Sequence, residues 1–489
     1  MLVDERLQSA TNQITLAEVE LIRPGLITMN HRLSLFLVAV VIAGLTSPLC
    51  ARTHSELSLV EVASDVGCLV EVRLRFRQQT SPAKQSGDWA SWRGPIGSGE
   101  AFGSPPIEWG ETKNIKWKTA IPGLGCSTPI AWKDRIYLTT AVAADAGDGD
   151  KAERGALDFR VLCIRRSDGE VVWSKSVIKT VPHESVHATA SQASNSPVTD
   201  GQRIYAHFGS RGIYCLDMSG KVVWSKQLGK MTIKHKFGEG SSPALAGDVL
   251  IVNWDHDGGS SFICALNKKS GKQIWRKERE EGATWATPAI TKVRGKTIAI
   301  VPASGKSCAY NVKNGKVIWS VSGLSSNVIP SPIVSEDVTY LMSGYKGTVL
   351  QAIKLMGAKG DLDDSKNILW THKRQTSYVP SALLYGGYIY FLRNTNAVLS
   401  CLDIRTGSPA YEGQRIAGLR TIYASPVAAN EHVYLLSRQG VAKVIKAGGT
   451  YEEVASNRLD DQFDASPIII GDELYLRGHR SLYCIREMP

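Results

Sequence analysis

The sequence predicts an all-β fold, an eight-bladed β-propeller closed by an N-terminal strand that completes the last blade. Three observations predict it: a unit of 41 to 50 residues recurs along the chain, the copies before the last contain four short strand patterns each, and the last copy is one strand short. The 489 residues include 45 Gly and 12 Trp, a composition that favours short strands joined by tight turns over helices.

Each unit opens with a small hydroxyl residue, which proline follows in seven of the eight copies. The openings are Thr128-Pro129, Ser196-Pro197, Ser242-Pro243, Thr287-Pro288, Ser331-Pro332, Ser381-Ala382, Ser425-Pro426 and Ser466-Pro467. The first spacing is longer, at 68 residues, which predicts an insertion over 141–158. Each opening begins an apolar run, and a Gly-Asp or Asp-Gly hairpin turn follows it in several units, as in "PVTDGQRIYAHF".

In the first five units the second half is a strand with Cys or Ala, a glycine turn and a strand that ends in Trp, as in "CALNKKSGKQIW" over 264–275. Glycine permits the tight turn, and the indole offers a large flat surface that can wedge between neighbouring blades. We therefore expect six structural docking residues: Trp117, Trp173, Trp224, Trp275, Trp319 and Trp370.

The two ends of the repeat region complement each other. The last unit, "SPIIIGDELYLRGHRSLYCIREMP", stops at its Cys strand, while "NIKWKTAIPG" over 114–123 is a Trp strand that precedes the first opening. Pairing these two strands would close the ring and protect two exposed sheet edges.

The N-terminal region divides into three parts. "MNHRLSLFLVAVVIAGLTSPLCA" over 29–51 has the basic start, apolar core and small-residue end of a signal peptide. Residues 1–28 are therefore expected to be either untranslated, with Met29 as the start, or disordered. Residues 52–87 are predicted to be a linker, and residues 88–489 the propeller. The mature chain is predicted to be exported to the periplasm or beyond, with no transmembrane helix, and lipidation of Cys50 stays open.

The repeated motif Cys/Ala-x-Asp/Asn-x-x-Ser/Thr/Asn-Gly-Lys-x-x-Trp resembles the tryptophan-docking repeat of the pyrroloquinoline quinone (PQQ)-type propellers. The resemblance covers residues 88–489, and "WASWRGPIGSG" over 89–99 looks like the opening of secreted propeller proteins of planctomycetes. The family includes quinoprotein dehydrogenases as well as a non-enzymatic lipoprotein of the outer-membrane assembly machinery. The resemblance therefore implies the fold and leaves both an enzyme and a scaffold open.

The enzyme interpretation requires features that this sequence lacks. Quinoprotein dehydrogenases of this family typically hold PQQ between a Trp and a disulfide of adjacent cysteines, and this chain has neither Cys-Cys nor Cys-x-x-Cys-His. The repeat cysteines should be buried small apolar residues, and no Cys-x-x-Cys pair predicts a metal site. We therefore expect no catalytic residues and no cofactor, with a PQQ-dependent dehydrogenase using PQQ and Ca²⁺ as the alternative.

The residues just before the unit openings are expected to form the rim of the central funnel, where aromatic, amide and acidic side chains could bind a ligand. They are Asn195, Glu239, Trp285, Asn327, Tyr378, Tyr423 and Asp464. In "NWDHDGG" over 253–259, Asp255 and Asp257 could ligate a metal ion or simply form a polar turn.

The chain is predicted to be a monomeric, non-catalytic scaffold. Its partner is predicted to be a protein or a polysaccharide at the cell envelope. After the scaffold and the PQQ-dependent dehydrogenase, a glycan-binding propeller is the third interpretation. The net charge is +11, but the sequence contains no Lys/Arg run of the kind that binds nucleic acid, so nucleic acid is not predicted.

Overall fold

The computed structural model describes residues 18–21, 57–58, 72–75, 88–144 and 155–488. The chain forms two compact units, 1–85 and 86–489. In the first unit, β1 (Glu18–Leu21), β3 (Val72–Arg75) and β2 (Leu57–Ser58) form an antiparallel sheet in that order. The predicted signal peptide over 29–51 lies outside the described residues, as does most of residues 1–28 and 52–87.

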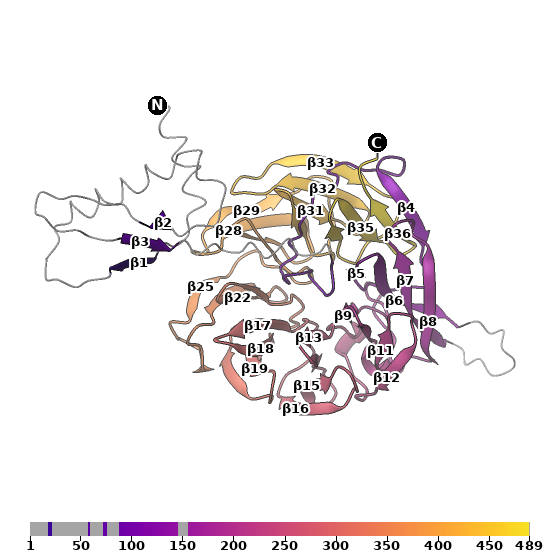
Figure 1. Ribbon diagram of the computed structural model, residues 1–489, viewed down its shortest axis with the longest axis horizontal. Coiled ribbons are helices and arrows are strands. Elements are labelled where there is room, and N and C mark those ends of the chain that lie inside the picture. The colour runs from indigo at the N-terminus through magenta and orange to yellow at the C-terminus, as the bar shows by residue number, and fades with distance from the viewer. Residues whose placement is uncertain (1–17, 22–56, 59–71, 76–87, 145–154, 489) are drawn as a thin grey trace, which may run out of the picture. The chain divides into compact units, whose positions relative to one another are not determined.

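The second unit consists of eight sheets arranged in a ring (Figure 1). Blade 1 contains β5 (Ile130–Trp132), β6 (Arg135–Ala143), β7 (Leu157–Arg165) and β8 (Val171–Thr180). Blade 2 contains β9 (Val198–Thr199), β10 (Arg203–His207), β11 (Ile213–Asp217) and β12 (Val222–Lys226). Blade 3 contains β13 (Ala244–Ala246), β14 (Val249–Trp254), β15 (Ser261–Asn267) and β16 (Gln273–Arg279). Blade 4 contains β17 (Ala289–Val293), β18 (Lys296–Val301), β19 (Ser307–Asn311) and β20 (Val317–Val321).

The remaining blades follow in chain order. Blade 5 contains β21 (Ile333–Ser335), β22 (Val338–Ser343), β23 (Val349–Lys354) and β25 (Ile368–His372). Blade 6 contains β26 (Leu383–Tyr385), β27 (Tyr388–Leu392), β28 (Val398–Asp403) and β29 (Pro409–Arg415). Blade 7 contains β30 (Val427–Ala429), β31 (His432–Leu436), β32 (Val441–Lys446) and β33 (Glu453–Arg458). Blade 8 contains β34 (Ile468–Ile470), β35 (Glu473–Arg477), β36 (Ser481–Ile485) and β4 (Ile115–Ala120).

The predicted all-β, eight-bladed propeller is therefore confirmed, including its closure. Strand β4 pairs antiparallel with β36, and Trp117 lies opposite Cys484 in the register. Two short 3₁₀ turns, Gly209–Arg211 and Lys234–Lys236, lie in loops. The insertion expected over 141–158 lies at the β6–β7 hairpin, whose two strands are nine residues long each. No helix among the described residues is long and apolar enough to cross a membrane.

The outer-strand tryptophans contact the next blade. The indole Nε1 of Trp224 donates a hydrogen bond to the Lys268 carbonyl at 3.0 Å, and Trp275 donates to the Val312 carbonyl at 2.7 Å. The glycine of the next blade's turn lies flat against the ring: Gly271 has φ +69°, and a Cβ there would lie 2.7 Å from the Trp224 ring. This glycine is needed both for its backbone conformation and for the close approach.

Trp319 departs from this pattern. Its side chain is buried, and the short strand β24 (Gly360–Asp361) pairs in parallel with β20, so that Gly360 lies opposite Trp319. The segment between β23 and β25 thus covers the outer edge of blade 4, while the edge of blade 5 is formed by β25. Covering an edge strand in this way satisfies part of its open backbone hydrogen bonding.

Residues 88–113, which we call the strap, run across one face of the ring before β4. In the strap, Trp89 forms two backbone hydrogen bonds with Ala131 of blade 1, one in each direction. The backbone N–H of Ala101 donates to the carbonyl of Ala428 in blade 7. Trp109 stacks on Tyr434 with ring centroids 6.3 Å apart. A single N-terminal segment therefore ties together blades that are far apart in sequence.

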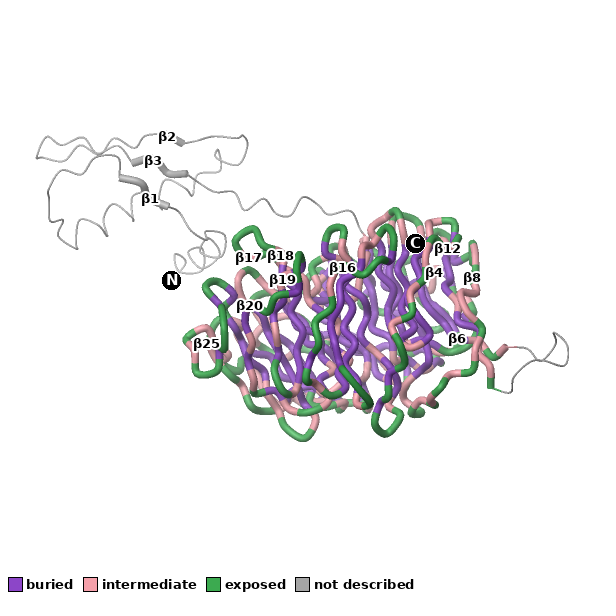
Figure 2. The backbone as a smooth tube through the Cα atoms, turned by 90° about the horizontal axis from the view of Figure 1, so that it is seen from below, coloured by how far each residue is buried: buried purple, intermediate pink, exposed green. Residues whose placement is uncertain are grey.

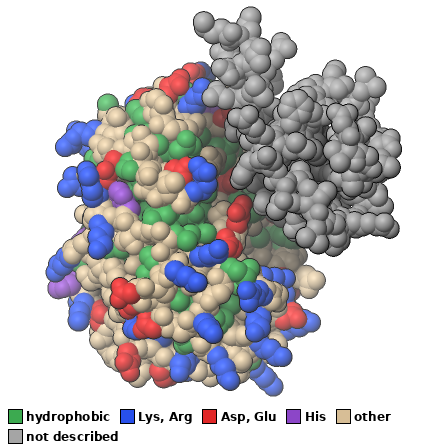
Figure 3. Space-filling model, turned by 90° about the vertical axis from the view of Figure 1, so that its left-hand side faces the viewer, with side chains coloured by type: hydrophobic (Ala, Val, Ile, Leu, Met, Phe, Trp, Pro, Cys, Tyr) green, Lys and Arg blue, Asp and Glu red, His purple; other side chains and the backbone are tan. Residues whose placement is uncertain are grey.

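Buried residues concentrate in the strands and exposed residues in the connecting turns (Figure 2). On the face seen in Figure 3, Lys and Arg side chains lie among Asp and Glu side chains. The positive charges on this face are thus dispersed and do not form the continuous basic surface that nucleic acid binding requires.

Candidate functional site

The eight unit openings form a closed ring of hydrogen bonds around the channel. The backbone N–H of each opening Ser or Thr donates to the hydroxyl oxygen of the next blade's opening residue, over 2.9–3.1 Å. The last bond runs from Ser466 N to Thr128 Oγ1 and closes the circle. The blade that lacks the proline keeps the hydroxyl: Ser331 N donates to Ser381 Oγ at 3.0 Å. The hydroxyl, and not the proline, is therefore the shared structural feature.

Each ring oxygen accepts a main-chain N–H and keeps its own O–H as a donor. Among the described residues, no protein acceptor takes a hydrogen bond from these eight hydroxyls, and all eight line a cavity of about 400 Å³, the funnel cavity. The channel thus presents a circle of hydroxyl donors to whatever occupies it.

We predict that Ser381→Ala lowers the free energy of unfolding by about 1–3 kcal/mol, because the buried N–H of Ser331 loses its acceptor. The measurement is urea unfolding followed by tryptophan fluorescence. Ser381→Thr is the matched control and should stay close to wild type, since Thr fills this position in the ring at residues 128 and 287. Equal losses in the two variants would contradict the importance of the hydroxyl.

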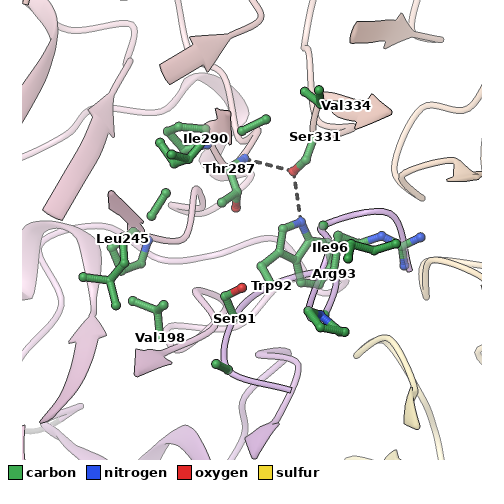
Figure 4. A pocket seen from close by; sticks show the side chains of 18 of the residues that line it. Ser91, Trp92, Arg93, Ile96, Val198, Leu245, Thr287, Ile290, Ser331 and Val334 are labelled. Atoms are coloured by element: carbon green, nitrogen blue, oxygen red, sulfur yellow. Dashed lines mark hydrogen bonds between the residues drawn. The ribbon is translucent and has the colours of Figure 1, made fainter. Parts of the chain in front are cut away.

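Trp92 of the strap lies at the base of this ring. Its indole Nε1 donates to Ser331 Oγ at 3.0 Å, and Ser331 Oγ also accepts from Thr287 N (Figure 4). Trp92 lines both the funnel cavity and a second cavity of about 410 Å³, the strap cavity. Val198, Leu245, Ile290 and Val334 of four innermost strands line the strap cavity. Trp92 therefore lies between the two cavities and contributes to the wall of both.

Five of the seven predicted rim residues line the funnel cavity: Glu239, Trp285, Tyr378, Tyr423 and Asp464. Tyr378 stacks on Tyr345, with ring centroids 4.8 Å apart, and Trp285 Nε1 donates to the Gly238 carbonyl at 2.7 Å. The wall of the cavity is thus partly aromatic, and its rings are held in place by defined contacts.

The two rim asparagines are not among the residues that line the funnel cavity. Asn195 is buried behind the ring, where Nδ2 donates to the Gly240 and Ser241 carbonyls and lies 3.2 Å from His207 Nδ1. Burial lowers the pKa of His207 to about 4, so this ring is neutral at physiological pH. Asn327 lies with Nδ2 3.5 Å from the Tyr378 hydroxyl.

Both carboxylates of the funnel cavity are paired with cations. Glu239 accepts from Arg211 Nη1 at 3.0 Å and from the hydroxyl of Ser210 at 2.7 Å. Asp464 Oδ1 lies 3.0 Å from Arg438 Nε, and Oδ2 lies 2.8 Å from His479 Nε2. The Arg438 guanidinium also lies 5.2 Å from the centroid of the Tyr423 ring. The cavity is therefore close to charge-balanced.

The predicted metal residues Asp255 and Asp257 lie in the β14–β15 loop, outside the lining of the funnel cavity. The buried Asp255 carboxylate accepts from Arg279 Nε at 2.8 Å and from the Thr284 hydroxyl at 2.7 Å. Burial by itself would lower the pKa of Arg279. The negative charge of Asp255 acts in the opposite direction and, with the other contacts of the guanidinium, outweighs burial, so the pKa of Arg279 lies above its ordinary value. Asp257 accepts from the backbone of Lys234 and Ala283. Metal binding by these two residues stays a prediction.

The repeat cysteines lie where the sequence suggests. Cys163, Cys215, Cys264, Cys401 and Cys484 are free and buried, and Cys308 is half-buried. Burial raises the pKa of Cys264 to about 12, which keeps the thiol neutral and unreactive.

The sequence arguments missed the hydroxyl ring, Trp92, and the approach of Cys126 to Asp464 and His479. The ring had a signal in the eightfold Ser/Thr, which was interpreted only as a strand marker. The other two have no local signal, because each depends on contacts across more than 200 residues.

The comparisons with known proteins agree with the repeat. A family model described as outer membrane protein assembly factor BamB matches residues 157–412, more than half of the chain. BamB from Moraxella catarrhalis is 12% identical with a TM-score of 0.50, and the alignment covers 76% of this chain and 99% of that one. A europium-containing methanol dehydrogenase is 10% identical with a TM-score of 0.59, covering 81% and 91% of the two chains.

The quinohemoprotein alcohol dehydrogenase from Comamonas testosteroni is also 10% identical, with a TM-score of 0.58 and coverage of 83% and 81%. No curated protein matches the sequence. At these identities the structural similarities establish the fold alone.

Proposed function

Because the chain belongs to the PQQ-like repeat family whose model is described as outer membrane protein assembly factor BamB, we propose that it is a non-catalytic binding protein that holds a partner at its funnel cavity. The observation that carries this proposal is the cavity itself: a concavity of about 400 Å³ with aromatic walls and a floor of eight hydroxyls. Such a combination of flat apolar surface and fixed polar groups is typical of recognition sites.

The chemistry of the wall favours a polar, uncharged segment as the bound group. Trp285, Tyr378 and Tyr423 offer ring faces, while Glu239 and Asp464 are already neutralised by cationic neighbours. A peptide loop or a sugar would gain stacking contacts and hydrogen bonds from the hydroxyl ring. We propose a protein loop first, because the family model is named for an assembly factor, and a polysaccharide second.

The residues of the cavity do not fit the PQQ and Ca²⁺ alternative. A calcium ion takes six to eight oxygen ligands, several of them carboxylates. Among the described residues only two carboxylates, Glu239 and Asp464, line the funnel cavity, and Glu239 would first have to give up its hydrogen bonds from Ser210 and Arg211. The indole of Trp92, bonded to the ring at Ser331, also occupies part of the cavity wall. We therefore propose no quinone chemistry for this chain.

The proposed compartment is the periplasm or the cell surface. It is supported by the signal-peptide pattern over 29–51 and by the membrane-assembly description of the family model.

The proposal is tested by site-specific photocrosslinking in cells of the source organism. A photoreactive phenylalanine derivative replaces Tyr378 in the cavity wall, or Ile274, which is 47% exposed on outer strand β16. We expect a discrete protein adduct from position 378 and none from position 274. A smeared, carbohydrate-staining adduct would favour the polysaccharide, and equal adducts from both positions would contradict a funnel site.

A parallel titration of the purified chain with PQQ and Ca²⁺ addresses the enzyme alternative. We expect no saturable change in absorbance or heat. One-to-one binding of the quinone would overturn the non-catalytic assignment and make dye-linked alcohol oxidation the next assay.

A further inference from the structure

Three side chains with metal-ligand chemistry meet beside the funnel cavity, at the seam where the ring closes. Cys126 lies between β4 and β5, Asp464 between β33 and β34, and His479 between β35 and β36. One ligand atom from each lies within 4.8 Å of the other two, and this is the one such group of three among the described residues. Cys126 and Asp464 line the funnel cavity.

We propose that Cys126, Asp464 and His479 bind one transition-metal ion of the Zn²⁺ class, with a fourth coordination position open toward the funnel cavity. A thiolate, an imidazole and a carboxylate are the ligand types that Zn²⁺ takes in proteins, and three protein ligands with one open position are typical of sites that bind a further group. The open position would accept a carboxylate, an imidazole or a water molecule.

The distance between the imidazole and the carboxylate needs only a small change to hold such an ion. His479 Nε2 lies 2.8 Å from Asp464 Oδ2, whereas two ligands of a tetrahedral Zn²⁺ lie ~3.3 Å apart, so the pair opens by about half an ångström. His479 is one-quarter exposed on a hairpin loop, which leaves its ring room to move. The metal would replace the hydrogen bond between the imidazole and the carboxylate.

The surroundings provide a second layer of contacts. Arg438 Nε lies 3.0 Å from Asp464 Oδ1, the oxygen that does not face His479, and so leaves Oδ2 accessible. Ser191 Oγ accepts from the backbone N–H of Cys126 at 3.0 Å and fixes that turn. Burial and the charge of Asp464 raise the pKa of the Cys126 thiol to about 11, a penalty that a bound cation would offset.

This site departs from the sequence expectation that the cysteines bind no metal. That expectation used the close spacing of zinc ligands, whereas here 338 residues separate Cys126 from Asp464 and the closed ring brings them together. The proposal does not depend on the proposed partner, since an ion could bind whether or not a protein occupies the funnel cavity.

The test is metal binding by the purified full chain after chelator treatment. Co²⁺ titration is followed by absorbance, because a thiolate ligand gives a charge-transfer band in the near ultraviolet, and Zn²⁺ affinity is measured by competition with a chromophoric chelator. We expect one ion per chain and a thiolate band. Loss of a residue that only holds a metal ligand in place weakens metal binding about 10–100-fold. Loss of a ligand itself should have a larger effect, so Cys126→Ser and His479→Gln should each weaken metal binding at least about 100-fold.

Two matched controls are available. Cys308→Ser changes the other half-buried cysteine of the described part of the chain, and His235→Gln changes an exposed histidine; both variants should bind Co²⁺ and Zn²⁺ as wild type does. Circular dichroism shows that each variant is folded, and His479→Gln decides the question if Cys126→Ser unfolds. Absence of binding, a Co²⁺ spectrum without the thiolate band, or equal affinities of the seam and control variants would overturn the proposal.

Discussion

Deletion of residues 1–120 is expected to abolish cooperative folding of the propeller, whereas deletion of residues 1–87 should leave it intact. The longer deletion removes the strap and β4, and with them the buried side chains of Trp89, Trp109 and Trp117, which are 1%, 5% and 8% exposed. Truncation of one buried Trp costs about 3–5 kcal/mol, so the three together cost at least about 9 kcal/mol. Natural domains are stable by only about 5–15 kcal/mol.

The deletion also exposes the edge of β36, because β4 is its partner in blade 8. The measurement is thermal unfolding by circular dichroism, together with size-exclusion chromatography to detect aggregation through the open edge. The shorter deletion is the control, since the second compact unit begins at residue 86. A cooperative transition of the longer deletion at the control's midpoint would show that closure by β4 is dispensable.

Asp255→Ala is expected to lower the free energy of unfolding by about 3–5 kcal/mol. The carboxylate is 0% exposed and its partner Arg279 is 2% exposed, so the substitution leaves a buried guanidinium without its counter-charge. The measurement is denaturant unfolding monitored by tryptophan fluorescence.

The double variant Asp255→Ala with Arg279→Met shows whether the lost stability comes from the missing ion pair or from the guanidinium that is left without a counter-charge. Replacing both members of a buried pair by apolar groups is often close to neutral, so the double variant should recover most of the loss. The same experiment tests the alternative of a metal at Asp255: we expect added Ca²⁺ to leave the wild-type midpoint unchanged. A calcium-dependent rise that Asp255→Ala removes would favour the metal.

The repeat is strong enough in the sequence to predict the fold in detail, for a physical reason. Each unit joins four strands and docks on the next unit, so the residues that form the turns and the docking contacts recur at a fixed period. The openings at Ser196 and Ser242, and the Gly-x-x-x-Trp run that ends at Trp275, are such residues. The orphan strand over 114–123 likewise predicted the closing partner of β36.

The candidate site was predictable only in part. Position before the unit opening placed Glu239, Trp285 and Asp464 at the funnel cavity, because that connection lies at the same end of every blade. The same rule failed to bring Asn195 into the cavity lining, since its amide turns behind the ring to bond the Gly240 carbonyl.

By itself, the sequence determined the number of blades, the order of their strands, the closure and the residues at which blades dock. The tertiary structure alone decided which side chains meet across the channel. Trp92 bonds to Ser331 because the strap crosses the ring, and Cys126 approaches Asp464 because the ring closes. Structure that repeats locally can be predicted from the period of the sequence. Contacts between distant parts of the chain depend on how the ring is closed and covered.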